Sequence, residues 1–130
     1  MAVGILLVTH PGIGSAILDV AKRMFPNLPM PVEVAEVGYE GTASEWLPKA
    51  SAQMRKIDQG DGVLLLVDLY GATPGNVAKE LQQISTQCRR VSALNLCMLL
   101  RVLNYPELKL DQLQSMAAQG ARMGIVLDDA

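Results

Sequence analysis

The stretch GVLLLVD at residues 62–68 decides the fold, because it contains the most apolar run of the chain and ends on a single acid. Five consecutive aliphatic residues without polar alternation are typical of a strand that is buried on both faces of a parallel sheet. On either side of it, short apolar runs alternate with stretches of helical periodicity. This alternation predicts an α/β fold, a mostly parallel sheet with helices on both faces.

The remaining elements are placed from apolar periodicity and from helix start and stop signals. The expected strands are residues 3–8, 32–37, 63–67 and 91–96, followed by a short terminal strand at 124–127. The expected helices are residues 13–24, 47–57, 73–84 and 98–103, and a last helix that starts at Asp111 with Gln114 in a capping box. Pro48 fits only in a first helical turn, and Thr73 before Pro74 is expected to cap its helix.

The composition points to one ordinary domain. The chain has 130 residues, half of them hydrophobic, and a net charge of −2 without any block of like charge, so we expect a single domain over residues 1–130 and no nucleic-acid partner. The N-terminal apolar run is only a strand long and has no basic flank, so we expect no signal peptide, no direct membrane insertion and a cytoplasmic location. One histidine and two cysteines offer no cluster for a metal.

Chemistry is expected beyond the carboxyl ends of the strands, where ligands bind in open α/β sheets. His10 follows the first strand and Asp68 follows the third, so the two side chains are predicted to face each other across one rim. A carboxylate that hydrogen-bonds one ring nitrogen fixes the tautomer of a histidine and leaves the other nitrogen as a nucleophile. We therefore predict that His10 attacks and Asp68 orients it.

A phosphoryl group on His10 would need donors for its oxygens, and a helix N-terminus supplies free amides with a favourable dipole. Two loops precede helices at this rim: one contains Gly12, and the other contains Gly71, Ala72 and Thr73. The spacing from Gly12 to Ile17 does not complete a dinucleotide fingerprint, so no cofactor is expected.

Simpler interpretations of the same residues stay open at this point. A single histidine at a strand end is more often structural than catalytic. Asp68 taken alone is also a reasonable loop-capping acid, and Thr73 taken alone is a reasonable helix cap. A non-catalytic α/β interaction module with an incidental histidine is therefore one alternative.

Two segments carry a family resemblance: GILLVTH at residues 4–10 and GVLLLVDLYGATPGN at residues 62–76. The chain resembles the enzyme IIA domain of the mannose family of the bacterial phosphoenolpyruvate-dependent sugar phosphotransferase system, over essentially its whole length. The resemblance implies that His10 is the phosphorylated residue, Asp68 its hydrogen-bonding carboxylate and Thr73 a hydroxyl that holds the phosphoryl group.

The same resemblance implies the partners. The donor would be the phosphorylated carrier HPr and the acceptor a histidine on an enzyme IIB domain, without metal or nucleotide, in sugar uptake or in regulation by phosphorylation state. It also implies a homodimer with the C-terminal strand at the subunit contact. An apolar terminal edge strand agrees with this, because an uncovered edge invites pairing.

Two other phosphoproteins are alternatives. One is the phosphocarrier of a dihydroxyacetone kinase system, which has a similar fold and histidine. The other is a receiver-type signalling domain phosphorylated on Asp68. In a receiver domain the first strand should end in an acidic pair that binds magnesium, whereas here it ends in Thr9 and His10.

Overall fold

A computed structural model describes residues 2–85 and 87–129, and its four strands pair in parallel in the order β2-β1-β3-β4. The strands are β1 (Gly4–Thr9), β2 (Val32–Glu36), β3 (Val63–Val67) and β4 (Cys88–Ser92). The predicted α/β fold is confirmed, with the two most apolar strands, β1 and β3, side by side at the centre of the sheet. Their carboxyl ends therefore meet at one rim.

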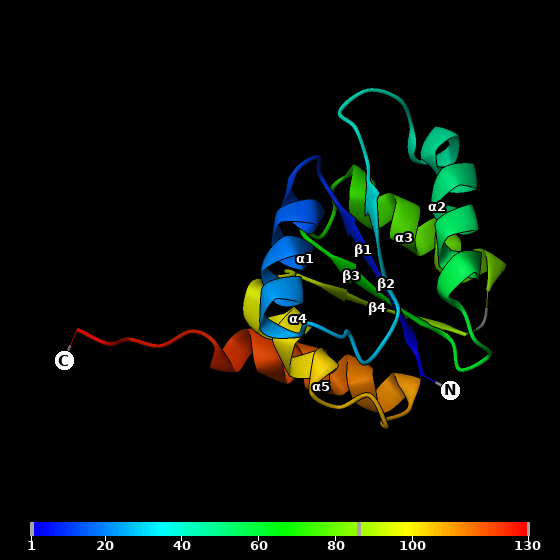
Figure 1. The fold of residues 1–130 in the computed structure, drawn as a ribbon. Coiled ribbons are helices and arrows are strands. Elements are labelled where there is room, and N and C mark those ends of the chain that lie inside the picture. The colour runs from blue at the N-terminus through cyan, green and yellow to red at the C-terminus, as the bar shows by residue number, and fades with distance from the viewer. Residues whose placement is uncertain (1, 86, 130) are drawn as a thin grey trace.

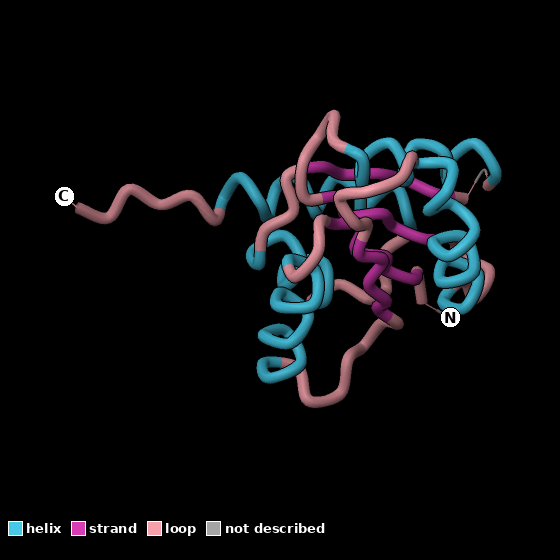
Figure 2. Tube along the Cα trace, turned by 90° about the horizontal axis from the view of Figure 1, so that it is seen from above, coloured by secondary structure: helices cyan, strands magenta, loops and turns pink. Residues whose placement is uncertain are grey.

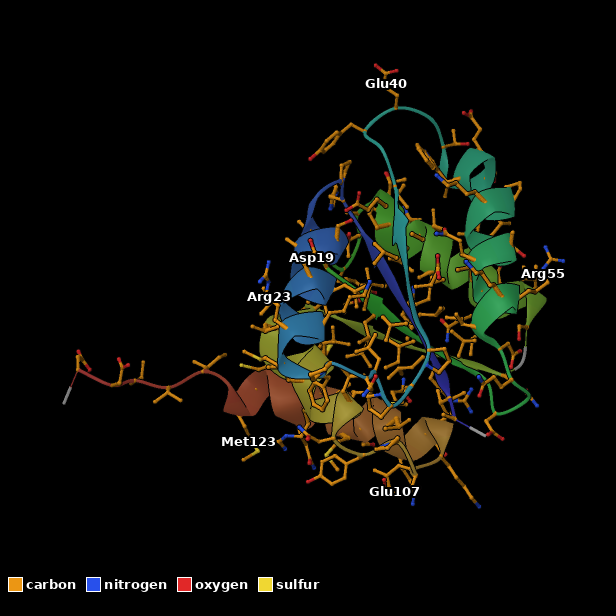
Figure 3. The ribbon with its side chains drawn as sticks, in the orientation of Figure 1. Asp19, Arg23, Glu40, Arg55, Glu107 and Met123 are labelled. Carbon is orange, nitrogen blue, oxygen red and sulfur yellow. The ribbon has the colours of Figure 1, made fainter. Side chains whose placement is uncertain are left out.

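Helices cover both faces of this sheet (Figures 1 and 2). One face packs against α1 (Ile13–Met24), α4 (Leu96–Leu103) and α5 (Leu110–Met123), and the other packs against α2 (Ala43–Ile57) and α3 (Thr73–Ile84). The sheet has one hydrophobic core on each face, and alternate residues of β3 point into each of them. Leu64 and Leu66 pack in the core beside α1, α4 and α5, and Leu65 packs in the core beside α2 and α3. Figure 3 shows charged side chains of the outer helices, such as Arg23 and Arg55, pointing away from the sheet.

The fourth strand starts three residues earlier than predicted and ends four residues earlier, at Cys88–Ser92 instead of 91–96. The prediction missed the start of this strand because Arg89 and Arg90 interrupt the apolar pattern. Charged residues are nevertheless common on an edge strand. The apolar run that suggested 91–96 is divided between the end of β4, a loop and the start of α4. Asn95 ends the loop and caps α4, because its Oδ1 accepts a hydrogen bond from the Met98 amide at 2.8 Å.

Three helix starts also differ from the predictions, the simplest being α4, which begins at Leu96 instead of residue 98. The helix α2 begins at Ala43 behind the Thr42 cap, so Pro48 lies inside the helix and not in its first turn. Pro48 and Ser44 are both exposed, so the Ser44 carbonyl that loses its intrahelical donor can face water. The helix α5 begins at Leu110, and the side chain that reaches back to the Lys109 amide, at 3.0 Å, is that of Gln112 and not of Gln114.

The predicted terminal strand at 124–127 is not formed. Residues from Ile125 to Asp129 belong to no strand and extend away from the body of the chain (Figure 1). Ile125, Val126 and Leu127 are 76%, 69% and 88% exposed, so the single chain leaves these three apolar side chains largely in water.

Among residues 2–85 and 87–129, no helix combines the length and the apolar character that crossing a membrane requires.

Candidate functional site

His10 stands at the carboxyl end of β1, and the residue before it holds its backbone in place. Thr9 is fully buried. Its hydroxyl donates a hydrogen bond to the His10 carbonyl at 2.8 Å and accepts one from the Gly14 amide at 2.9 Å. These two bonds link the last strand residue to both ends of the turn that leads into α1, so the imidazole projects from a fixed turn.

Asp68 follows β3 directly, and the structure brings it against His10. Its Oδ2 lies 2.8 Å from His10 Nδ1 and also accepts the His10 backbone N–H at 2.9 Å. The parallel register, in which Val8 pairs with Val67, places the two strand ends side by side despite 58 residues of separation. The other carboxylate oxygen, Oδ1, is buried and has no hydrogen-bond partner within the described residues. The hydrogen bonds to this carboxylate therefore all come from His10.

The pairing leaves one ring nitrogen of His10 available. When Nδ1 donates to Asp68, Nε2 carries the free lone pair, and Nε2 makes no hydrogen bond within the described part of the chain. The His10 side chain is 24% exposed and the Asp68 side chain only 6% exposed. The arrangement can thus present a nucleophilic nitrogen to a partner while the carboxylate stays buried behind it.

An aromatic ring that the sequence analysis did not single out lies beside His10. The rings of Tyr39 and His10 stack with centroids 5.9 Å apart and an interplanar angle of 29°. Tyr39 sits in the loop between β2 and α2, and Trp46 of α2 supports this loop by donating its indole N–H to the Glu40 carbonyl at 3.0 Å. No periodicity marks a loop residue, so only the fold could bring Tyr39 to the site.

The turn between β3 and α3 carries the predicted residues Gly71, Ala72 and Thr73. Gly71 has a φ of 85°, and a Cβ there would meet no atom within 4 Å. The first intrahelical hydrogen bond runs from the Asn76 amide to the Ala72 carbonyl at 3.1 Å, so the Thr73 and Gly75 amides precede the hydrogen-bonded part of the helix. Amides in such a first turn are suited to oxyanions.

Thr73 is not the helix cap that its sequence predicts. The capping position belongs to Ala72, no side chain caps α3, and Thr73 is the first helical residue. The hydroxyl of Thr73 is therefore not engaged with the backbone amides of its own helix.

Gly12, the remaining predicted phosphoryl contact, is engaged by a residue that the sequence analysis missed. The Gly12 amide donates to Glu36 Oε2 at 2.8 Å, and the same oxygen accepts from the Ser15 hydroxyl at 2.8 Å and the Ser15 amide at 3.4 Å. Glu36 ends β2 and lies in register with Thr9. The one available signal was an acid, Glu36, near the end of the predicted strand 32–37.

The Ser15 hydroxyl is the main cause of a lowered pKa for the Glu36 carboxyl, and the Gly12 and Ser15 amides act in the same direction, whereas partial burial opposes them. Because the folded pKa lies below the ordinary value of 4.5, the unfolded chain takes up the proton more readily. The stabilisation by Glu36 is then fully present above pH 4.5 and is lost as the pH falls through the folded pKa.

This pH dependence can be measured. Wild type should be more stable than Glu36→Gln at pH 6, and the difference should shrink as the pH falls below 4.5, because only the wild-type residue changes its charge. Urea denaturation of both proteins between pH 6 and pH 3 measures the difference. A gap that stays constant over this range would contradict the charged contact.

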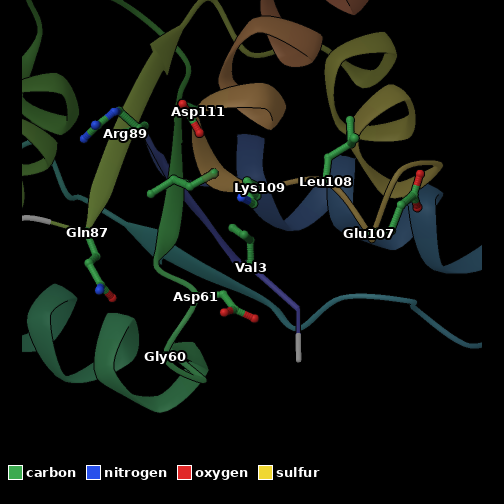
Figure 4. A pocket seen from close by; sticks show the side chains of 10 residues that line it. Val3, Gly60, Asp61, Gln87, Arg89, Glu107, Leu108, Lys109 and Asp111 are labelled. Atoms are coloured by element: carbon green, nitrogen blue, oxygen red, sulfur yellow. The ribbon is translucent and has the colours of Figure 1, made fainter.

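A cavity of about 480 Å³ lies at the amino ends of the strands, opposite the His10 rim, and Figure 4 shows the side chains that line it. It is lined by residues at the amino ends of the strands, such as Val3, Asp61 and Gln87, and by the segment before α5. Ligands of open α/β sheets bind beyond the carboxyl ends, so the His10 rim is the better candidate. Within the described residues, no cluster of three or more histidine, cysteine or acidic side chains could hold a metal ion.

Comparison with known proteins gives a consistent answer. Residues 4–117 match the protein family described as PTS system fructose IIA component. The chain is 27% identical to the PTS system mannose-specific EIIAB component of Escherichia coli (strain K12) and, equally, to that of Shigella flexneri. Each match covers 96% of this chain, which spans only 39% of the length of these relatives.

Solved structures show the same fold. The mannose/sorbose specific IIA subunit of the phosphotransferase system from Enterococcus faecalis superposes with a TM-score of 0.87 at 24% identity, covering 100% of this chain and 97% of that one. The PTS IIA protein associated with the fucose utilization operon of Streptococcus pneumoniae gives a TM-score of 0.79 at 22% identity, covering 98% and 96%. At these identities the likeness concerns the fold.

Proposed function

Because the chain belongs to the enzyme IIA family of the mannose type in the sugar phosphotransferase system, we propose that it is a cytoplasmic phosphocarrier that accepts a phosphoryl group on His10. The donor is phosphorylated HPr, and the acceptor is a histidine of an enzyme IIB domain. The transfer serves sugar uptake or regulation by phosphorylation state.

The contact of 2.8 Å between His10 Nδ1 and Asp68 Oδ2 carries this proposal. Nε2 attacks the phosphorus of the donor, a P–N bond forms to His10, and the bond from phosphorus to the donor breaks. The ring then bears a positive charge, which the buried Asp68 carboxylate balances through the Nδ1–H hydrogen bond. In the return step a histidine of the acceptor attacks the phosphorus, and His10 leaves as the neutral ring.

The first turn of α3 binds the phosphoryl oxygens in this proposal. Gly71 and Ala72 bring the chain into the helix, the Thr73 amide points out of its N-terminus, and the Thr73 hydroxyl is not used as a cap. Free amides, a helix dipole and one hydroxyl together favour an anion at this position.

The stability of the phosphorylated chain towards acid and alkali tests the proposal. Acid protonates the ring nitrogen of a phosphohistidine and releases the phosphate, whereas hydroxide attacks the carbonyl carbon of an aspartyl phosphate. After incubation with phosphorylated HPr, the label should survive alkali, be lost in mild acid and map to the peptide that contains His10. Rapid loss in alkali with the label on the Asp68 peptide would favour a receiver-type domain instead, and no labelling at all would favour a non-catalytic module.

Two substitutions of Thr73 test the role of its hydroxyl while leaving its backbone amide in place. Thr73→Ser keeps the hydroxyl and should transfer phosphoryl at nearly the wild-type rate. Thr73→Val should slow transfer by about 10- to 100-fold, because a hydrogen bond to a charged group contributes roughly 1.5–3 kcal/mol. Since the hydroxyl caps nothing, both variants should stay within about 0.5 kcal/mol of wild-type stability. Equal transfer rates in rapid-quench experiments would remove Thr73 from the site.

We also propose that the exposed tail contacts a second copy of the chain. Three apolar residues of the tail, Ile125, Val126 and Leu127, are largely exposed, and β4 is an edge strand of the sheet. The full chain should therefore be a dimer, and deletion of the residues after Gly124 should give a monomer in light scattering. Asp128→Asn keeps the apolar residues and should stay dimeric. A truncated protein that remains a dimer of unchanged geometry would refute the contact.

A further inference from the structure

Two helices begin at the rim that carries His10. A carboxylate occupies the N-terminus of one helix but not that of the other. The first turn of α3 has no side-chain cap. The N-terminus of α1 also lacks a conventional cap, because Gly12 occupies the capping position, but a carboxylate from another strand takes its place. That carboxylate is Glu36, with three hydrogen bonds from Gly12 and Ser15 to a single oxygen, Oε2.

The backbone of Glu36 is fixed as well. It is the last residue of β2, and its Cα pairs with that of Thr9, the residue before His10. The following amide, that of Val37, donates to the Thr9 carbonyl at 2.8 Å. Glu36 is thus attached to the sheet on one side and to the turn of His10 on the other, so its side chain connects β2 to the start of α1.

The donors that Glu36 uses are those that an oxyanion would use. Two backbone amides and one serine hydroxyl at the start of a helix are typical contacts of a bound phosphate. With the carboxylate in place these donors are satisfied, and its negative charge also repels a second anion. The α1 side of the rim therefore disfavours the phosphoryl group, whereas the α3 side remains open to it.

We propose that Glu36 is a positioning residue for phosphoryl transfer: it occupies the N-terminus of α1 as an internal anion, holds the turn that carries His10, and directs the phosphoryl group to the N-terminus of α3. This inference rests on the proposed function for its role in transfer. The occupation of the α1 N-terminus by Glu36 does not depend on transfer and can be tested separately.

The first experiment uses inorganic phosphate as the probe and requires no transfer. The full chain is titrated with phosphate at pH 7 while the amide signals of Gly12, Ser15, Gly71 and Thr73 are followed by NMR. In wild type the Gly12 and Ser15 signals should stay unchanged. In Glu36→Ala they should shift in a saturable way, because their donors have become free. Unchanged signals in Glu36→Ala, or equal shifts in wild type, would overturn the inference even if phosphoryl transfer is confirmed.

The second experiment follows the phosphorylated wild-type chain. The amide signals of Gly71 and Thr73 should move on phosphorylation by more than those of Gly12 and Ser15. Larger shifts at Gly12 and Ser15 would show that the phosphoryl group lies on the α1 side, which would overturn the inference. No phosphorylation at all would refute the proposed function and leave the first experiment as the test of Glu36.

The phosphoryl-transfer rates of two Glu36 variants show whether this residue positions His10 or only stabilises the fold. Glu36→Ala should slow the maximal rate of transfer about tenfold or more, because small displacements of a reacting group are costly, with little change in the donor concentration for half saturation. Glu36→Gln keeps an oxygen acceptor for Gly12 and Ser15 and should recover most of the rate. If Glu36→Ala does not fold, Glu36→Gln still decides. A Gln variant that loses its rate while its Gly12 and Ser15 signals remain unchanged would overturn the positioning role.

Discussion

Replacing His10 with alanine should abolish phosphoryl acceptance completely. His10 is the only histidine of the chain, and its Nε2 is the atom to which the proposed P–N bond forms. The neighbouring Asp68 cannot replace it, because its side chain is only 6% exposed behind the ring. The measurement is the incorporation of labelled phosphate from phosphorylated HPr.

The fold should survive this change. The His10 side chain projects from the rim and is partly exposed, and its backbone N–H keeps the hydrogen bond to Asp68 in the variant. His10→Gln is the companion variant, since its side-chain amide can still donate to Asp68 but cannot carry a stable phosphoryl group. Circular dichroism should show folded protein for both variants, and neither should become labelled. Labelling of either one would end the proposed function.

Replacing Asp68 with asparagine should slow transfer by about 10²-fold or more, with the fold unchanged. The substitution keeps the size of the side chain but removes the charge that balances the imidazolium and fixes the Nδ1 tautomer. In catalytic triads the corresponding change of the orienting acid costs about 10⁴-fold. The smaller figure applies here because the backbone N–H of His10 still helps to hold residue 68.

The residue two positions before β3 provides a matched control. Asp61 is an exposed acid at the opposite end of the segment that contains β3, and Asp61→Asn makes the same chemical change far from the rim. Rapid-quench kinetics should show wild-type transfer for Asp61→Asn and slow transfer for Asp68→Asn. Equal rates for the two variants would reduce Asp68 to a structural loop residue.

The central part of this site could be predicted from the sequence because it depends on strand ends. Two apolar runs identify β1 and β3 as buried parallel strands, and a parallel sheet brings their carboxyl ends together. The contact between His10 and Asp68 then follows from topology alone. The membership of the enzyme IIA family, expected from two motifs, is confirmed over residues 4–117.

Other features could not be predicted because they depend on side-chain geometry between distant elements. Glu36 reaches from the end of β2 to Ser15 in the first turn of α1, and Tyr39 reaches His10 from a loop without periodicity. The fourth strand was misplaced because its inner residues are arginines at a sheet edge. The predicted cap at Thr73 is wrong by one residue, because the cap is Ala72 and Pro74 is the second helical residue. The Thr-Pro sequence cannot distinguish the two positions, since the amides of the first helical turn have no intrahelical partner and proline loses no hydrogen bond at either one.

The indole contact that supports the loop of Tyr39 gives this chain a built-in optical reporter. Trp46 is the only tryptophan, and its N–H is bonded to Glu40, next to the tyrosine that stacks on His10. Its ring also lies against Gly38, where an added Cβ would meet Trp46 Cζ2 at 2.8 Å. Intrinsic fluorescence is therefore expected to report on this loop, so a partner protein that contacts the loop should change the signal in stopped flow without an attached dye.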